Sequence, residues 1–218
     1  MMDQSHKAQL VMELRRQGVD PRVMTVLEAI PREVFVEAVY QSQAWANRAL
    51  PIGCDQTISQ PIVVGLMTSA LDVGPRMKVL EVGTGSGYQA AVLSRLCRRL
   101  YTIERHRPLS RVAEQRFHQL GLHNITTMVG DGTRGWPEQA PFDRIMVTAA
   151  AFREIPQALL DQLKPGGILV LPIGYEPGTD QELIKVVKPE EEGAEPVVTH
   201  LFPVRFVPLV EGLPVGNG

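Results

Sequence analysis

The chain carries the run Val79-Leu80-Glu81-Val82-Gly83-Thr84-Gly85-Ser86-Gly87-Tyr88, in which an apolar stretch leads into three glycines at alternate positions. Glycine has no Cβ, so its backbone takes positive φ and comes close to a ligand. A helix that begins after such a loop turns its free N–H groups toward that ligand. The run therefore predicts a buried strand, a loop that binds an adenosine-bearing cofactor, and a helix.

Short β-rich runs alternate with helical segments along the rest of the chain. We predict strands at 78–82, 100–103, 125–129, 144–148 and 168–171, and helices at 88–96, 108–120 and 156–163. This alternation is typical of a largely parallel sheet with helices on both faces. The predicted fold is therefore α/β and Rossmann-like.

Two further strands are predicted near the C-terminus, at 182–187 and 197–207. The segment between them, 189–196, is charged and rich in turn residues, and no helix is expected there. A direct connection of this kind favours an antiparallel pair at the edge of the sheet.

The sequence before the glycine run has a different character. Residues 5–38 are predicted to be helical because they carry apolar side chains at helical spacing, and Asp20-Pro21 supplies an N-cap followed by a proline. Residues 41–61 hold two prolines and many short polar side chains, which predicts an irregular loop, and a helix is expected at 62–71. Loops carried by a rigid scaffold often supply functional residues.

Composition and charge narrow the function classes. The 218 residues are 44% hydrophobic and 21% charged, with a formal net charge of -2. These values are ordinary for a soluble globular protein and give no general attraction to nucleic acid or to an anionic membrane. The N-terminus lacks the apolar run of a signal peptide, and Cys54 and Cys97 fit neither a metal-ligand spacing nor a disulfide framework. We expect a cytoplasmic protein without a bound metal.

The spacing of the glycines indicates which cofactor binds. Tyr88 stands where the dinucleotide fingerprint Gly-x-Gly-x-x-Gly needs its last glycine, which counts against a nicotinamide enzyme. Glu81 lies inside the strand, and a carboxylate there would attract the sulfonium or ammonium of S-adenosylmethionine but repel a pyrophosphate. The charge favours S-adenosylmethionine.

Two more acidic residues end predicted strands. Glu104 has the usual position of a side chain that accepts both ribose hydroxyls, although a solvated charge is the alternative. Asp131, between two glycines, is expected to accept the adenine amino group, and an ordinary Asp-Gly turn is the alternative. Open α/β sheets bind ligands along the carboxyl ends of their strands, which favours the cofactor role for both.

Several short motifs identify the chain further. They are Ala49-Leu50-Pro51-Ile52-Gly53, Gln56-Thr57-Ile58-Ser59-Gln60-Pro61, the Glu81 to Tyr88 loop, Gly130-Asp131-Gly132, Pro141-Phe142-Asp143 with Val147-Thr148-Ala149-Ala150, Leu163-Lys164-Pro165-Gly166-Gly167 with Leu171-Pro172-Ile173-Gly174, and Val204-Arg205-Phe206-Val207-Pro208-Leu209. With these motifs the chain closely resembles the protein L-isoaspartate O-methyltransferase family over most of its length. The second and the last motif are the discriminating ones.

The resemblance implies a class I methyltransferase that transfers methyl from S-adenosylmethionine to the α-carboxylate of L-isoaspartyl residues in damaged proteins. The methyl ester then closes to a succinimide, and S-adenosylhomocysteine is the other product. Residues 1–70 would hold N-terminal helices and the acceptor-site loop, and residues 71–218 the cofactor-binding core, packed as one structural domain. We expect isoaspartyl proteins as partners, no nucleic acid or membrane, and a monomer.

The resemblance also assigns residues. It implies Ser59 as the catalytic position, with Thr57 beside it in the acceptor pocket. The expected cofactor-binding residues are Glu81, Gly83, Thr84, Gly85, Ser86, Gly87, Glu104, Asp131, Gly132 and Thr148. The expected substrate-binding residues are Gln60, Pro61, Ile62, Val204, Arg205, Phe206 and Val207.

The acceptor chemistry needs no general base. The α-carboxylate of an isoaspartyl residue has a pKa near ~3.5, so it is already ionised at neutral pH. The protein must instead hold the reacting atoms in line in a site closed to water, which hydroxyl donors do without neutralising the carboxylate. Ser59 is therefore expected to orient the acceptor, and capping of the following helix is the alternative role for Ser59 and Thr57.

The sequence is also compatible with two other functions. One keeps the fold and the cofactor but has a small molecule or another protein side chain as acceptor. The other is a cofactor-binding regulatory module without catalysis, against which the intact Thr57-Ile58-Ser59 segment argues.

Overall fold

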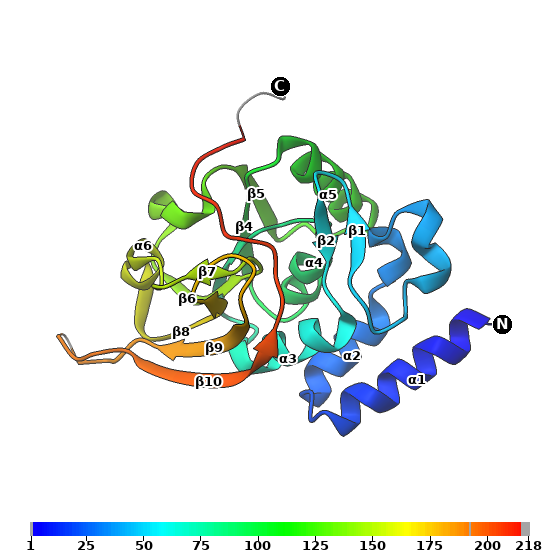
Figure 1. Cartoon of the computed structure of the whole chain (residues 1–218), viewed down its shortest axis with the longest axis horizontal. Coiled ribbons are helices and arrows are strands. Elements are labelled where there is room, and N and C mark those ends of the chain that lie inside the picture. The colour runs from blue at the N-terminus through cyan, green and yellow to red at the C-terminus, as the bar shows by residue number, and fades with distance from the viewer. Residues whose placement is uncertain (1, 192, 215–218) are drawn as a thin grey trace.

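The computed structural model describes residues 2–191 and 193–214 (Figure 1). Its helices and strands follow one another in the order α1 (Met2–Arg16), α2 (Pro21–Ala29), η1 (Arg32–Phe35), η2 (Ala38–Gln43), β1 (Leu50–Ile52), β2 (Gln56–Ile58), α3 (Pro61–Leu71), β3 (Lys78–Val82), α4 (Tyr88–Ser94), β4 (Arg99–Glu104), α5 (Arg107–Gln119), β5 (Ile125–Val129), η3 (Gly132–Arg134), η4 (Pro137–Gln139), β6 (Phe142–Val147), β7 (Ala151–Phe152), α6 (Gln157–Asp161), β8 (Leu163–Gly174), β9 (Gln181–Val187) and β10 (Val197–Val204), where η denotes a 3-10 helix.

One sheet organises the molecule. Its strands lie in the order β10-β9-β8-β6-β3-β4-β5, and β7 pairs with β8. The pairs among β5, β4, β3, β6 and β8 are parallel, whereas β9 and β10 run antiparallel at one edge. The predicted α/β, Rossmann-like fold with an antiparallel edge pair is confirmed.

The two faces of the sheet pack into two hydrophobic clusters, because successive side chains of a strand point to opposite faces. Val79 and Leu100 belong to a cluster that also holds apolar side chains of α1 to α5. Leu80 and Ile103 belong to a second cluster with Leu159 of α6. In Figure 1, α6 lies on the left and α1 to α5 on the right and below.

The N-terminal region is less helical than predicted. Helix α2 ends at Ala29, and Ile30 takes an extended conformation with φ -85° and ψ 122°. The next residue is Pro31, and a proline disfavours the helical conformation of the residue before it. Between α2 and β1 there are only two short 3-10 helices, η1 and η2. The prediction of helix through residue 38 is therefore wrong.

The predicted irregular loop at 41–61 contains a small hairpin. Strands β1 and β2 pair antiparallel, with Leu50 opposite Ile58 and Ile52 opposite Gln56. Each strand is three residues long, too short for an alternating pattern to stand out in the sequence. Cys54 and Asp55, at the turn, both have positive φ, which is uncommon outside glycine.

Other bounds differ from the predictions at the C-terminal end. Strand β8 is much longer than predicted, α6 is shorter, and β10 ends at Val204 before the tail reaches residue 207. The predicted division between residues 70 and 71 falls in the last turn of α3 and stays a prediction.

Residue 1, residue 192 in the β9–β10 connection, and residues 215–218 lie outside the described residues. Within the described ranges, we find no helix with both the length and the apolar character to cross a bilayer.

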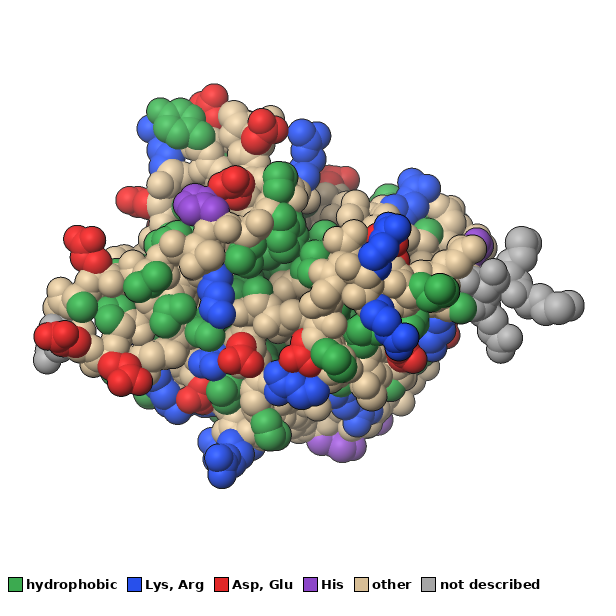
Figure 2. All heavy atoms as spheres, turned by 90° about the horizontal axis from the view of Figure 1, so that it is seen from below, with side chains coloured by type: hydrophobic (Ala, Val, Ile, Leu, Met, Phe, Trp, Pro, Cys, Tyr) green, Lys and Arg blue, Asp and Glu red, His purple; other side chains and the backbone are tan. Residues whose placement is uncertain are grey.

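Figure 2 views the face formed by the lower elements of Figure 1, including β10, α1 and α3. Acidic and basic side chains are interspersed over it, and apolar side chains gather in a hollow near its centre.

An ion pair fixes the amino ends of three neighbouring strands. Asp143 of β6 accepts a hydrogen bond from the Lys78 backbone N–H of β3 at 2.7 Å and from Lys164 Nζ of β8 at 2.6 Å. Burial alone would raise the pKa of Asp143, but these hydrogen bonds outweigh it and hold the pKa below the ordinary value. The pair therefore stabilises the fold at neutral pH and loses its effect as the pH falls through that lowered pKa.

We expect Asp143→Ala to lower the free energy of unfolding at pH 7 by roughly 1–3 kcal/mol, because it leaves the Lys78 N–H without its acceptor. Urea unfolding followed by circular dichroism measures the change. Asp180→Ala, at an exposed aspartate, is the control. Equal stability of the two variants would contradict the assigned role of Asp143.

Candidate active site

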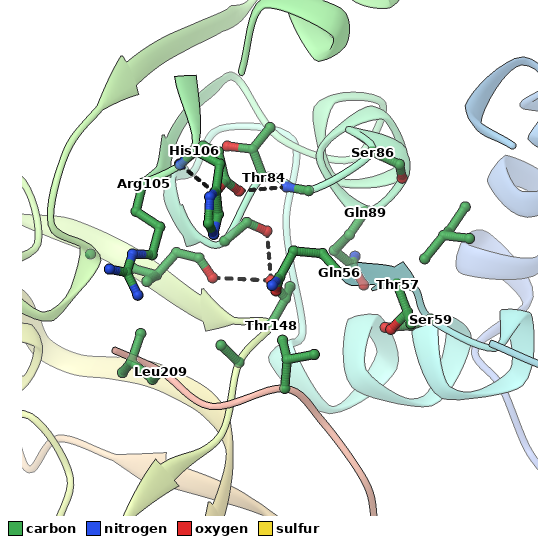
Figure 3. Close-up of a pocket in the computed structure, with 18 of the residues that line it drawn as sticks. Gln56, Thr57, Ser59, Thr84, Ser86, Gln89, Arg105, His106, Thr148 and Leu209 are labelled. Carbon is green, nitrogen blue, oxygen red and sulfur yellow. Dashed lines mark hydrogen bonds between the residues drawn. The ribbon is translucent and has the colours of Figure 1, made fainter. Parts of the chain in front are cut away.

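A cavity opens at the carboxyl ends of β3, β4 and β6, between the glycine loop and the C-terminal tail (Figure 3). It encloses about 960 Å³ of space, part of it open to solvent. Its lining residues are Gln56, Thr57, Ile58, Ser59, Val64, Val82, Gly83, Thr84, Gly85, Ser86, Tyr88, Gln89, Ile103, Glu104, Arg105, His106, Gly132, Thr148, Ala149, Val207, Pro208, Leu209 and Val210.

The glycine loop has the backbone that its sequence predicts. Gly83, Gly85 and Gly87 have φ of 96°, 52° and 88°, a backbone region that residues other than glycine rarely adopt. A Cβ on Gly83 would overlap Thr148 Oγ1, which donates to the Gly83 carbonyl at 2.5 Å. Glycine is thus required where the loop passes β6, and Thr148 fastens it there.

Glu104 ties the loop to the end of β4. Its Oε2 accepts a hydrogen bond from the Gly85 N–H at 2.8 Å and its Oε1 from the His106 N–H at 2.9 Å. These bonds are among the dashed lines of Figure 3. The carboxylate is nearly buried and lines the cavity, so it combines an anchoring role with the predicted ribose contact, which stays a prediction.

Glu81 is enclosed beneath the loop. Its side chain is 0% exposed, and its Oε2 accepts a hydrogen bond from Thr102 Oγ1, which lies 2.6 Å from Thr84 Oγ1. Burial raises the pKa of Glu81 to about 8, opposed by the Thr102 hydrogen bond and assisted by the charge of Glu104. Thr84, at the other end of this chain of hydrogen bonds, lines the cavity. The predicted contact of Glu81 with a cofactor stays a prediction.

Asp131 caps η3 and holds the C-terminal tail. Its Oδ1 accepts hydrogen bonds from Thr133 N and Oγ1 at 2.9 and 2.7 Å, and its Oδ2 accepts one from the Gly212 N–H at 2.8 Å. The structure thus contains the turn that was the alternative role for this residue. Gly132 lines the cavity beside it, so the predicted adenine contact stays a prediction.

A second cavity adjoins the first and collects most of the predicted acceptor residues. It is lined by Ala49, Thr57, Ser59, Gln60, Val63, Thr148, Pro203, Val204, Arg205, Phe206 and Val207. Thr57, Ser59, Thr148 and Val207 line both cavities. The predicted donor and acceptor residues therefore meet at these four side chains, although they come from distant parts of the chain.

The other two predicted acceptor residues, Pro61 and Ile62, belong to helix α3. Pro61 and Ile62 are buried in the first turn of α3. The alternative role of Ser59 and Thr57 in capping this helix is wrong: the N-cap is Gln60, and Asn47 accepts a hydrogen bond from the Ile62 N–H at 3.3 Å. The loop before the hairpin caps α3, which leaves the Ser59 hydroxyl for the cavity.

The sequence did not predict several of the residues that line the first cavity. Arg105 and His106 directly follow Glu104 at a strand end, a position that signals a ligand site. Gln56, Gln89 and Val210 gave no such signal. Across residues 2–191 and 193–214, we find no group of three or more metal-ligating side chains.

Comparisons with known proteins agree with this geometry. A sequence model of the protein-L-isoaspartate(D-aspartate) O-methyltransferase family matches residues 4–213. This chain belongs to that family. A protein-L-isoaspartate O-methyltransferase of Paramagnetospirillum magneticum is 64% identical over 206 residues, or 94% of each chain. One from Rhodospirillum rubrum is 59% identical over 212 residues, covering 96% of this chain and 95% of the relative.

Solved structures share the fold. A protein-L-isoaspartate O-methyltransferase that is 29% identical superposes with a TM-score of 0.83. The match covers 93% of this chain and 65% of the solved chain. A putative relative from Plasmodium falciparum, solved with S-adenosyl-L-homocysteine, is 23% identical with a TM-score of 0.77 and covers 95% of this chain and 99% of its own. The second likeness concerns the fold alone.

The raised pKa of Glu81 leads us to predict how the free energy of unfolding depends on pH. A carboxyl with a higher pKa in the folded than in the unfolded state favours folding when protonated, so this contribution is lost as the pH rises from about 4.5 toward 8. Between pH 5 and pH 7 we expect the wild-type free energy of unfolding to fall by about 2 kcal/mol relative to Glu81→Gln. Urea unfolding at both pH values measures it, with the exposed Glu176→Gln as control; equal pH dependence in all three proteins would refute the assignment.

Proposed function

We propose that this protein methylates the α-carboxylate of L-isoaspartyl residues in damaged proteins, using S-adenosylmethionine. One observation carries the proposal: the cavity at the glycine loop and the cavity at the C-terminal tail share the lining residues Thr57, Ser59, Thr148 and Val207. Such a meeting point is what transfer between a bound donor and a protein acceptor requires.

The residues of the first cavity fit the cofactor. A Cβ on Gly132 would overlap Val82 Cγ1, so the backbone there packs directly against β3 with no room for a side chain. We propose that the Gly83 to Gly87 loop, Thr84 and Glu104 hold the amino-acid and ribose parts, and that Gly132 and Asp131 lie at the adenine. Bound S-adenosylmethionine supplies an electrophilic methyl group on a positive sulfonium, and S-adenosylhomocysteine is its demethylated form.

Ser59 and Thr57 orient the acceptor. The acceptor is already a carboxylate at neutral pH, so no side chain has to remove a proton. Ser59 is half-buried at the junction and Thr57 is exposed toward it, and their hydroxyls donate hydrogen bonds to a carboxylate without neutralising it. Arg205 is exposed in the second cavity and adds an attractive positive charge.

The C-terminal tail excludes water from the junction. Ala150 donates to the Val207 carbonyl at 2.8 Å and accepts from the Leu209 N–H at 2.8 Å, so the tail runs beside β6 and over the first cavity. The Gln181 side chain bonds both the Phe206 N–H and the Phe206 carbonyl, at 2.7 and 3.0 Å. Held in this way, residues 204–207 form a wall against which a substrate peptide lies, and backbone recognition of this kind tolerates varied side chains.

The two cysteines bear on the compartment in which the protein acts. Cys54 and Cys97 are both free thiols, which persist in a reducing compartment, and we propose a cytoplasmic enzyme. We further propose that it acts as a monomer, without metal, nucleic acid or membrane.

A transfer assay tests the acceptor class. With methyl-labelled S-adenosylmethionine we expect base-labile label on a peptide that contains isoaspartate, and background label on the same peptide with aspartate. Equal labelling of both peptides, or of neither, would overturn the proposal. Label on a small molecule would favour another acceptor, and cofactor binding without transfer would indicate a regulatory module.

A substitution tests the role of Ser59. We expect Ser59→Ala to lower kcat for the isoaspartyl peptide by about 10- to 100-fold, because a donor that orients the carboxylate is lost. The Kd for S-adenosylmethionine, measured by calorimetry, should stay within about threefold, which corresponds to less than a single net hydrogen bond. Ser42→Ala, at an exposed serine of η2, is the control. Full activity of Ser59→Ala would show that the hydroxyl plays no part.

A further inference from the structure

Arg32 is a fully buried cation close to the proposed acceptor. It is the first residue of η1, and its side chain is 0% exposed. No carboxylate in the described part of the chain forms an ion pair with it. Removing a guanidinium from water is costly unless its donors are satisfied. Two of the guanidinium nitrogens donate hydrogen bonds to backbone carbonyls.

The guanidinium joins the N-terminal region to the acceptor segment. Its Nε donates to the Ala44 carbonyl at 2.7 Å, and its Nη2 donates to the Ser59 carbonyl at 2.7 Å. Both are short charge-assisted hydrogen bonds, the stronger kind. The planar, forked guanidinium therefore fixes the backbone of Ser59 in one place.

The same group also contacts the start of α4. Its plane lies over the Tyr88 ring, 4.6 Å from the ring centroid, and Tyr88 is the residue directly after the glycine loop. Phe35 packs against Tyr88, with the two ring centroids 5.4 Å apart in an edge-to-face geometry. Arg32 thus sets Ser59 against a fixed point of the cofactor site.

A second arginine makes the corresponding contact on the donor side. Arg116 of α5 donates from Nη1 to the Ser86 carbonyl in the glycine loop at 2.8 Å, and its guanidinium lies 5.9 Å from the Phe35 ring centroid. Arg116 therefore fastens the loop and Arg32 fastens the acceptor segment, with Phe35 and Tyr88 between them. The two contacts provide a matched pair of substitutions.

We propose that Arg32 is a positioning residue for methyl transfer, which acts by holding the Ser59 backbone at a set distance from the cofactor loop. The inference rests on the proposed function for its kinetic consequence. The glycine loop keeps its own fastenings to Glu104 and Thr148, so loss of Arg32 displaces the acceptor segment more than the donor site.

The kinetic test compares Arg32→Met with Arg116→Met. We expect Arg32→Met to lower kcat for the isoaspartyl peptide by about 100-fold, the cost of a small displacement of a reacting group, while the Kd for S-adenosylmethionine changes by less than about threefold. Arg116→Met should show the reverse pattern, with weakened cofactor binding. Arg15→Met, at an exposed arginine of α1, should leave both values unchanged.

Arg32→Lys separates position from charge. A lysine keeps the positive charge but lacks the planar fork that reaches two carbonyls at once. We expect this variant to remain at least tenfold slower than wild type, and it also serves if Arg32→Met fails to fold. Wild-type kcat in Arg32→Lys, or equal losses of kcat and cofactor affinity in the Arg32 variants, would overturn the inference.

Hydrogen exchange gives a readout that does not depend on activity. In the Arg32 variants we expect faster amide exchange at residues 56–60, with exchange at residues 81–87 unchanged. Unchanged exchange at 56–60 would overturn the inference even if kcat falls. A wild-type protein that fails to methylate isoaspartyl peptide would instead refute the proposed function, and the exchange result would still decide the role of Arg32.

Discussion

The structure depends on one tight backbone turn at the end of β3. Gly83 and Thr84 both donate to the Ile103 carbonyl, at 2.8 and 3.2 Å, while the Gly83 carbonyl accepts from Thr148. The ends of β3, β4 and β6 are thereby joined around residues whose φ only glycine adopts readily. A side chain at Gly83 would overlap Thr148 Oγ1 and disturb this join, and both the first cavity and the tail beside β6 lie at that edge of the sheet.

The proposed acceptor side is held by polar contacts to its backbone. Gln181 fixes Phe206, Ala150 fixes Val207, and Arg32 fixes Ser59, in each case through the backbone. Backbone anchoring leaves the side chains that line the second cavity free to contact a substrate. It suits a protein whose acceptors share a damaged linkage and differ in the residues around it.

The sequence predicted best what hydrophobic periodicity and glycine spacing determine. The strands near Val79 and Leu100 were found because they are buried on both faces and read as apolar runs. The hairpin at 50–58 was missed because three-residue strands have no period. Arg32 gave no signal, because an arginine beside Pro31 resembles a surface residue until the chain folds over it. Motifs indicated that Ser59 and Arg205 share a site, whereas the Asn47 cap and the Gly212 contact of Asp131 arise only in three dimensions.

The second cavity combines Thr57, Ser59 and Gln60 with residues 203–207, which lie far apart in the sequence. Contacts between such distant segments form only after the long intervening loop has been closed, at an entropic cost that the sheet between them must first offset. During synthesis the glycine loop emerges well before the tail that completes the site. A partly made chain therefore has its glycine loop but lacks the second cavity, which is completed only by residues at and just after the end of β10.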